Sequence, residues 1–335
     1  MPLEPEERRP RLTPAIADVR RAVRDALADA PQGSLFLVAL SGGADSLALA
    51  AATAFEAPRA GLRAGAVIVD HGLQDASAEV ARAAAAQARE LGLDPVDVVR
   101  VHVDPAGAEG PEGSARTARY EALAARASSH GAAAVLLAHT LDDQAETVLL
   151  GLARGSGAGS LQGMAADAGL LRRPLLGIRR SETRAFCDDA RLPYWSDPHN
   201  LDPAYARVRV RERVLPVLEA ELGPGIAEAL ARTAEQLRED NEAFQRMIDE
   251  LIEDIVEHVD AGIAISIPAL EINPPALRGR IVRYVAQSEF GVALERVHVQ
   301  AVLRLVTDWR GQKPLDLPGF SAAREGRMLV LRAAG

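Results

Sequence analysis

The most constraining feature of the sequence is an apolar run that ends abruptly in a glycine-rich loop. Residues 35–40 read LFLVAL, and the next six residues read SGGADS. A short, continuous apolar run of this kind predicts a strand buried on both faces of a sheet. Residues 46–55 have the character of a helix, so the loop joins a buried strand to the start of a helix.

The loop has the composition of a phosphate-binding site. Its two glycines permit a tight turn and a close approach of the backbone to a ligand. Its two serines offer hydroxyl groups, and the amides at the start of the next helix point at the same place. Asp45 supplies a carboxylate that can share a magnesium ion with a bound phosphate. The expected phosphate-binding residues are Ser41, Gly42, Gly43, Ala44, Asp45 and Ser46, with Asp45 as the metal ligand.

Two other nucleotide-binding motifs are excluded. A Walker loop needs GxxxxGK[ST], and the only lysine in the sequence is Lys313. The GxGxxG fingerprint of dinucleotide-binding proteins is absent as well.

Strands and helices alternate through the first half of the sequence. Strands are expected at 35–40, 64–70, 96–103 and 133–138, and helices at 14–30, 46–55, 77–91, 114–129 and 142–152. This alternation predicts an α/β domain with a parallel sheet covered on both faces. Ligands bind at the carboxyl ends of such strands, where the loop 41–46, the pair Asp70-His71 and His139 all fall.

The second half of the sequence predicts smaller elements. Residues 154–180 are glycine-rich and irregular, and a helix is expected at 181–191. Residues 214–259 predict a long acidic helix, or a pair of helices broken near Gly223. The last part predicts a strand at 263–267, helices at 275–288 and 295–308, and a terminal strand pair near 315–317 and 328–331. We therefore expect a catalytic domain at 1–213, an acidic helical connector at 214–260 and a small mixed α+β domain at 261–335.

The cysteine count and the distribution of apolar residues indicate the cellular compartment of the protein. Cys187 is the only cysteine, which excludes a disulfide within the chain and a cysteine-ligated iron–sulfur cluster. No run of about 18 apolar residues occurs, and the charged N-terminus lacks the apolar core of a secretory signal. We expect a cytosolic protein with no membrane partner.

The net charge of −9 is unevenly distributed. Residues 151–213 and 261–335 each carry a net charge of +4, whereas residues 214–260 carry −10. A polyanion responds to the local potential rather than to the sum over the molecule. The two basic zones are therefore compatible with RNA binding.

A second motif, HTLDDQAET at 139–147, opens the helix that follows the fourth strand. At spacings of four and three, His139, Asp143 and Glu146 share one helix face. Three ionisable groups at the edge of a parallel sheet suit magnesium or amine binding. The alternative is that the acidic pair Asp142-Asp143 only complements the helix dipole, which leaves His139 and Glu146 unexplained.

These motifs together resemble the tRNA(Ile)-lysidine synthetase family, within the PP-loop ATP pyrophosphatases. The matching segments occur in the family's order: SGGADS at 41–46, VDHGL at 69–73, EGSARTARYE at 112–121, HTLDDQAET at 139–147, RGSGAGSLQGM at 154–164 and the block at 196–216. The resemblance is dense over residues 34–216 and looser through LDLPGF and AREGRMLVLR. It implies the adenine nucleotide alpha hydrolase-like fold of PP-loop proteins.

The resemblance implies a two-step reaction on the CAU anticodon of tRNA(Ile). ATP adenylates the wobble cytidine and releases pyrophosphate, and L-lysine then displaces AMP to form lysidine. In this reading His139 contacts the α-phosphate, and Asp143 and Glu146 position the lysine amine, one of them as base. Arg119 and Arg211 match motif arginines and stabilise phosphate charge or the adenylated base. The expected tRNA contacts are Arg207, Arg209, Arg278, Arg280 and Arg283.

Several alternatives stay open at this point. Gln74 and Val208 depart from the family pattern, where arginine and asparagine are expected. The alternating arginines of 207–213 would point one way on an extended chain and scatter on a helix. The sequence does not decide whether the chain forms a homodimer. Other functions to weigh are another PP-loop tRNA-modifying enzyme and a non-catalytic ATP-binding RNA adaptor.

Overall fold

The computed structural model describes residues 12–72, 77–101, 110–155, 157–197 and 202–334. The chain forms two compact units, Met1–Gln236 and Leu237–Gly335. Their boundary falls within the acidic segment 214–260, and the three-part division expected from the sequence stays a prediction. In the part of the chain that the structure describes, no helix is long and apolar enough to cross a membrane.

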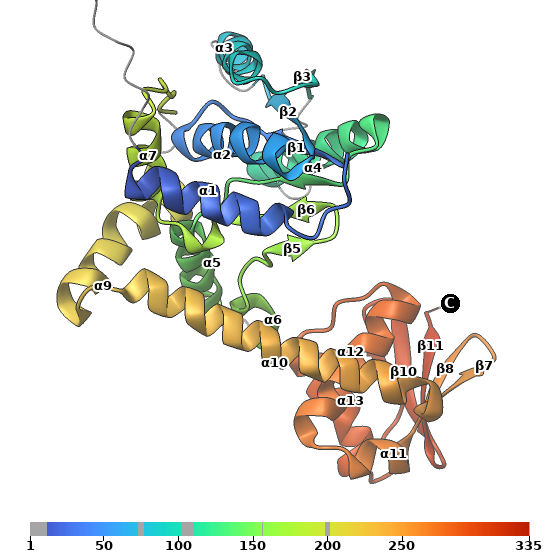
Figure 1. The fold of residues 1–335 in the computed structure, drawn as a ribbon. Helices are drawn as coiled ribbons and strands as arrows, with labels where there is room; N and C mark the ends of the chain where they lie inside the picture. Colours follow the sequence, from blue (N-terminus) through green and yellow to red (C-terminus); the bar gives the residue numbers. More distant parts are fainter. Residues whose placement is uncertain (1–11, 73–76, 102–109, 156, 198–201, 335) are drawn as a thin grey trace, which may run out of the picture. The chain divides into compact units, whose positions relative to one another are not determined.

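The first unit is built on a six-stranded sheet with the order β3-β2-β1-β4-β6-β5 (Figure 1). The strands are β1 Leu35–Ala39, β2 Arg63–Asp70, β3 Val96–Arg100, β4 Ala134–Leu136, β5 Asp167–Ala168 and β6 Leu171–Arg172. All the pairings are parallel except that between β5 and β6. The predicted parallel α/β fold is confirmed.

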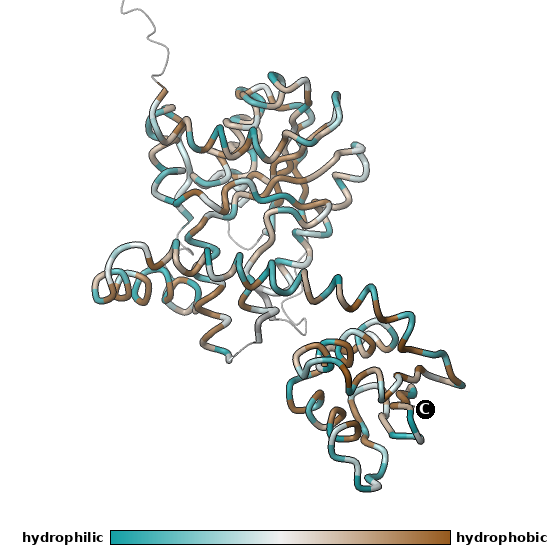
Figure 2. Tube along the Cα trace, turned by 60° about the horizontal axis from the view of Figure 1, so that its bottom comes forward, coloured by the Kyte–Doolittle hydropathy of each residue, from teal (hydrophilic) through white to brown (hydrophobic). Residues whose placement is uncertain are grey.

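Helices cover both faces of this sheet. The helices of the sheet region are α1 Pro14–Leu27, α2 Ala44–Glu56, η1 Pro58–Ala60, α3 Ser77–Glu90, α4 Gly110–His130 and α7 Arg180–Asp189. Phe36 and Val38 pack in one cluster with residues of α1, α2, α3 and α7, whereas Leu35 and Leu37 pack with Leu123 of α4. Successive strand residues point to opposite faces, so this alternation buries β1 on both sides. Figure 2 shows the hydrophobic segments gathered along these strands.

The order of the strands reverses beside β1. The chain runs from β1 to β2 and β3 on one side, then returns to place β4 on the other side of β1. Such a switch point opens a crevice at the carboxyl ends of the two strands, and ligands of α/β proteins bind there. The glycine-rich loop follows β1, and His139 follows β4, so both predicted motifs lie at this crevice.

The remaining helices of the first unit begin after β4, and the last of them, α10, continues into the second unit. They are α5 Leu141–Ala153, α6 Ala158–Leu161, η2 Pro174–Gly177, α8 Ala206–Arg209, the π-helical turn η4 Val210–Val214, α9 Leu215–Leu222 and α10 Ile226–Ile255. The region 154–180 was expected to be irregular, but it adds β6 to β4 through the pair Val135–Leu171. Two-residue strands are too short to give a periodic signal. The arginines of 207–213 lie on helical turns, which settles the alternative left open by the sequence.

The second unit contains a five-stranded antiparallel sheet with the order β7-β8-β11-β10-β9. Its elements are β7 Val256–Val259, β8 Gly262–Ser266, α11 Ile267–Ile272, α12 Pro275–Phe290, α13 Arg296–Thr307, β9 Leu315–Leu317, β10 Phe320–Glu325 and β11 Met328–Ala333. Phe320 is buried and stacks on Phe290, with ring centroids 4.7 Å apart. Two expectations were wrong: β7 replaces a helical end, and β9 and β11 each pair with β10 instead of with each other.

Candidate active site

The glycine-rich loop is held by its own serines. The Ser46 hydroxyl accepts a hydrogen bond from the Ser41 amide at 3.1 Å and donates to the Gly43 carbonyl at 3.0 Å. Gly42 has a φ of +83°, a conformation that favours glycine. Gly43 is the N-cap of α2 and makes no side-chain capping bond, so the first amides of the helix are open to an anion.

Asp45 lies in the first turn of α2, and α7 supplies its partners. Thr183 donates its hydroxyl to Oδ1 of Asp45, and Arg180 Nε lies 3.5 Å from Oδ2. Burial raises the pKa of Asp45, and the nearby charge of Asp143 adds to this, against the opposing effects of Thr183 and Arg180. The pKa is therefore above its ordinary value, as expected for a carboxylate whose negative charge is incompletely compensated.

Asp143 is fixed at the start of α5 by a capping box. Its Oδ2 accepts hydrogen bonds from the backbone amide and the hydroxyl of Thr140, both at 2.8 Å. Its Oδ1 accepts from Arg180 Nη2 at 2.8 Å. Burial alone would raise the pKa of Asp143, but Arg180, the Thr140 amide and Arg207 outweigh burial and lower it. Asp143 is therefore held as a carboxylate.

Glu146 is fully buried and surrounded by three arginines. Arg211 Nε lies 2.7 Å from Oε1, Arg207 Nε lies 2.9 Å from Oε2, and Arg180 Nη1 lies 3.2 Å from Oε1. The Glu146 side chain is 0% exposed, and its carboxylate is the shared counter-ion of these arginines. Its expected role in positioning the lysine amine stays a prediction.

Arg180 and Thr183 are functional candidates that sequence reasoning missed. Arg180 is 13% exposed and contacts Asp45, Asp143 and Glu146 together. Thr183 is 0% exposed. Many short helices begin with a basic residue and a threonine, so nothing in the local sequence marks Arg180 and Thr183 as site residues. Only the packing of α7 against α2 brings them to the site.

Two histidines follow β4 and β2. Burial lowers the pKa of His139 to about 4, so this side chain is neutral at pH 7. Arg119 Nε and Nη2 both lie 3.4 Å from His71 Nε2. Burial lowers the pKa of Arg119, and burial followed by the Arg119 charge lowers that of His71. Arg119 is thereby tied to the carboxyl end of β2, at the same edge of the sheet as the loop.

Most of the predicted tRNA contacts are engaged within the protein. Arg207 binds Glu146, and Arg209 Nη1 donates to the carbonyls of Pro203 and Ala204, both at 2.7 Å. In the second unit, Arg278 donates to the carbonyls of Asn273 and Glu271, both at 2.7 Å.

The other two arginines of α12 differ from Arg278. Arg280 lies 2.9 Å from Asn241 Oδ1 and 4.1 Å from the Phe244 ring centroid. Arg283 is exposed, and burial, Arg280 and Arg296 lower its pKa, so positive charges are its principal electrostatic neighbours.

The structure describes one of the two residues that depart from the family pattern. Gln74 lies outside the described residues. Val208 is buried in α8, with 8% exposure. An apolar side chain suits this position, where α8 packs against α5.

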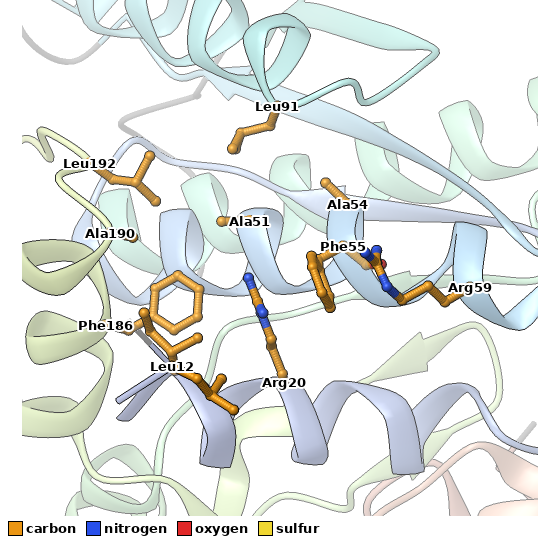
Figure 3. Close-up of a pocket in the computed structure, with 11 residues that line it drawn as sticks. Leu12, Arg20, Ala51, Ala54, Phe55, Arg59, Leu91, Phe186, Ala190 and Leu192 are labelled. Carbon is orange, nitrogen blue, oxygen red and sulfur yellow. The ribbon is translucent and has the colours of Figure 1, made fainter. Parts of the chain in front are cut away.

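A cavity of about 350 Å³ lies elsewhere, among α1, α2 and α7 (Figure 3). Its lining is mainly apolar, and the Phe55 ring lies between the guanidinium groups of Arg20 and Arg59, with carbon-to-centroid distances of 3.5 and 3.4 Å. None of the predicted site residues lines this cavity, so we do not place the active site there.

The site suits a magnesium ion that is shared with a phosphate rather than enclosed by protein. In the part of the chain that the structure describes, no group of three or more His, Cys, Asp or Glu side chains could hold a metal. Magnesium in nucleotide sites often takes one or two carboxylates and keeps water and phosphate ligands. Asp45 fits that role, because it is 27% exposed, lies beside the open helix terminus and has a raised pKa.

The switch-point loop and the carboxylates beside it define an ATP-using PP-loop domain. The family model described as the PP-loop domain matches residues 16–218, more than half of the chain. A second model, the TilS substrate binding domain, matches residues 265–330. The solved U34-tRNA thiolase NcsA from Methanococcus maripaludis is similar in fold, with a TM-score of 0.56, 21% identity, and coverage of 67% of this chain and 80% of that one.

Curated relatives define the family more closely. A tRNA(Ile)-lysidine synthase from Leifsonia xyli subsp. xyli is 62% identical over 89% of this chain and 90% of its own length. One from Thermobifida fusca is 55% identical over 94% and 95%, and one from Streptomyces coelicolor is 52% identical over 90% and 86%. The chain belongs to the tRNA(Ile)-lysidine synthase family of ligases.

Proposed function

We propose that this chain joins free L-lysine to the wobble cytidine of the CAU anticodon of tRNA(Ile), at the expense of ATP. The observation that carries the proposal is the meeting of Asp45 and Asp143 at one guanidinium, that of Arg180, beside the open phosphate-binding loop. Asp45, the expected partner of magnesium on ATP, and Asp143, the expected partner of the lysine amine, therefore lie at the same edge of the sheet. The similarity to curated lysidine synthases supports the substrates.

In the first step, the carbonyl oxygen of the cytosine attacks the α-phosphorus of ATP, and pyrophosphate leaves. The amides of Gly43 and Ala44 and the loop serines hold the leaving phosphates, as helix N-termini do for anions. A magnesium ion on Asp45 would neutralise phosphate charge that develops during the attack. His139, neutral at pH 7, is suited to hydrogen-bond the α-phosphate without adding a full charge.

In the second step, the side-chain amine of lysine attacks the activated carbon of the base, and AMP leaves. The amine must lose a proton before it attacks, and Asp143, which is partly exposed and ionised, is suited to hold the ammonium group in place. Glu146 acts indirectly by fixing the guanidinium groups of Arg180, Arg207 and Arg211. Arg119 and Arg211 supply positive charge for the phosphate and the adenylated base.

The tRNA contact is proposed for residues 261–335 of the second unit, which carry a net charge of +4. Arg283 and Arg296 are exposed and repel each other, so a phosphate between them would lower their electrostatic energy. A homodimer and a cytosolic location stay predictions.

The experiment is mass spectrometry of the anticodon after incubation of unmodified tRNA(Ile) with ATP and labelled lysine. Lysine incorporated at the wobble cytidine supports the proposal. Pyrophosphate release without incorporation would point to another PP-loop modification, and neither product would indicate an RNA adaptor. Sulfur transfer is disfavoured because Cys187 is buried, which raises the pKa of its thiol to about 12.

A further inference from the structure

The cavity among α1, α2 and α7 lies apart from the phosphate-binding loop and takes no part in the proposed reaction (Figure 3). Its lining residues on α2 come six to ten positions after Asp45, which at a rise of about 1.5 Å per residue is roughly 9–15 Å along the helix. Two charged residues, Arg20 and Arg59, line it, and no carboxylate of the described residues does. The rest of the wall is apolar and includes Ile16, Ala54 and Phe186.

The two arginines bring like charges together at the cavity. Their guanidinium carbons lie 3.5 and 3.4 Å from the Phe55 ring centroid, so these charges are no more than about 7 Å apart and repel each other. The contact with the ring stabilises each guanidinium but does not neutralise its charge. Burial lowers the pKa of Arg20, Glu56 opposes this effect, and Arg59 and Arg24 lower the pKa further. The cavity is therefore a site of uncompensated positive charge.

The acid that acts on Arg20 is already bound by another arginine. Arg24 Nε lies 2.9 Å from Glu56 Oε2, and Arg24 Nη2 lies 3.0 Å from Oε1, so both oxygens of this carboxylate are engaged. Arg20 Nε is buried and has no hydrogen-bond partner among the residues that the structure describes. Figure 3 shows the Arg20 side chain extending from α1 into the space between the rings of Phe55 and Phe186. A buried N–H group without a partner is costly unless a ligand or water accepts from it.

We propose that this cavity binds a small molecule with one anionic group on an apolar body, such as a medium-chain carboxylate. The anionic group accepts a hydrogen bond from Arg20 Nε and lies near the Arg59 guanidinium, and the apolar body lies against Ile16, Ala54 and Phe186. The volume of about 350 Å³ is at the lower end for ligand pockets and suits a compact ligand. An inorganic anion leaves the apolar wall unused, and a neutral apolar molecule leaves the two charges uncompensated.

A ligand in this cavity acts on the helix that carries two residues of the active site. The end of α7 walls the cavity together with α1 and α2, whereas Arg180 and Thr183, at the start of α7, reach Asp45. A ligand that contacts all three helices requires the folded unit, so it should raise the melting temperature as its concentration rises. The anion thus stabilises the placement of α7 without touching ATP.

Binding is tested on the full-length protein with the fluorescent anion 1-anilinonaphthalene-8-sulfonate. Its fluorescence should saturate with a single site. Octanoate should displace it at least tenfold more strongly than 1-octanol, because octanoate alone supplies a charged acceptor for the arginines. Octanoate should also raise the melting temperature, and ATP with magnesium should leave the probe bound. Absence of saturable binding, equal displacement by octanoate and 1-octanol, or competitive displacement by ATP would each overturn the proposal.

Variants of two neighbouring arginines on α1 locate the anionic group. Arg20→Met keeps an apolar stem beside Phe55 and removes the charge, so octanoate should bind about tenfold more weakly while 1-octanol binding changes little. Arg21→Met removes an exposed charge that pairs with Asp18 outside the cavity, and it should keep the affinities of the wild type. Equal losses of octanoate affinity in the two variants would mean that only the general charge of α1 attracts the anion, and would overturn the assignment.

A cavity-filling variant locates the apolar body. Ala54→Leu adds volume to the cavity wall without changing any charge, so it should weaken the binding of octanoate and 1-octanol by about tenfold or more. Thermal unfolding checks that the variant is folded. Octanoate binding that persists unchanged in a folded Ala54→Leu protein would place the ligand elsewhere and overturn the proposal.

Discussion

Arg180 and Asp143 form a largely buried ion pair, with Nη2 2.8 Å from Oδ1, that joins the start of α7 to the start of α5. The same guanidinium lies 3.5 Å from Asp45, at the start of α2. Three helices that begin at the carboxyl edge of the sheet are therefore connected through one side chain. Both half-reactions of the proposed mechanism depend on its position.

Replacement of Arg180 by glutamine should impair both half-reactions and lower stability. Removal of one partner from a buried ion-pair cluster leaves uncompensated charge and costs about 3–5 kcal/mol. Thermal unfolding and separate assays of pyrophosphate release and lysine transfer measure these effects. Arg184→Gln, an exposed change on the same helix, is the control. A stable Arg180→Gln protein with normal rates would refute the central role given to this residue.

Asp45→Asn should slow adenylation by about 100-fold or more while the fold stays intact. The change removes the charge that would hold magnesium at the phosphates, but an amide oxygen can still accept from Thr183. Pyrophosphate release at several magnesium concentrations measures the effect, and circular dichroism checks the fold. Near-normal turnover in a folded protein would exclude the ATP site as described.

Asp143→Ala should act on the second half-reaction. Adenylated tRNA should accumulate without lysidine if Asp143 holds the amine and its proton. Single-turnover analysis of the tRNA separates the two products. If pyrophosphate release fails instead and lysine affinity is unchanged, Asp143 acts with magnesium and not with lysine.

Stability should fall as the pH is lowered from 7 to 5, in part because of His139. Its folded pKa of about 4 lies below the unfolded value, so the unfolded chain binds more protons between these two pKa values. The contribution at pH 5 is about 1–2 kcal/mol for a partly screened group. Urea unfolding at both pH values should show a smaller loss for His139→Asn than for the wild type. Equal losses would mean that His139 titrates normally in the folded protein.

The parts of the fold that could be predicted from the sequence are those with a clear hydrophobic pattern or a recognisable motif. The buried strand β1, its loop and the helix α2 follow from local pattern alone, because a buried strand, two glycines and a helix start are each encoded within a few residues. The strands β5 and β6 span only two residues each and depend on the edge of β4. In the site, Asp45 and Asp143 were predicted, whereas Arg180 and Thr183 were not, because only tertiary packing brings α7 to them. The burial of Glu146 likewise depends on Arg207 and Arg211, some 60 residues further along the chain.

The basic residues of the second unit should matter for tRNA and not for ATP. The three predicted tRNA contacts on α12 have different surroundings in the structure. Arg278 binds backbone carbonyls, and Arg280 stacks on Phe244, whereas Arg283 is exposed beside positive neighbours. Arg283→Ala should reduce the magnitude of the slope of log affinity against log salt by about 0.7–0.9. Equilibrium titrations that give the Kd for tRNA at each salt concentration measure this slope.

The matched controls for this test are on the same helix. Arg278→Ala should lower thermal stability and leave the salt slope nearly unchanged, because its hydrogen bonds join the start of α12 to the end of α11. Neither change should alter the KM for ATP, since the phosphate-binding loop belongs to the other unit. The double variant Arg283→Ala with Arg296→Ala should reduce the slope about twice as much as Arg283→Ala alone, because each arginine would neutralise its own phosphate. A slope that stays constant in the double variant would mean that this face does not touch RNA.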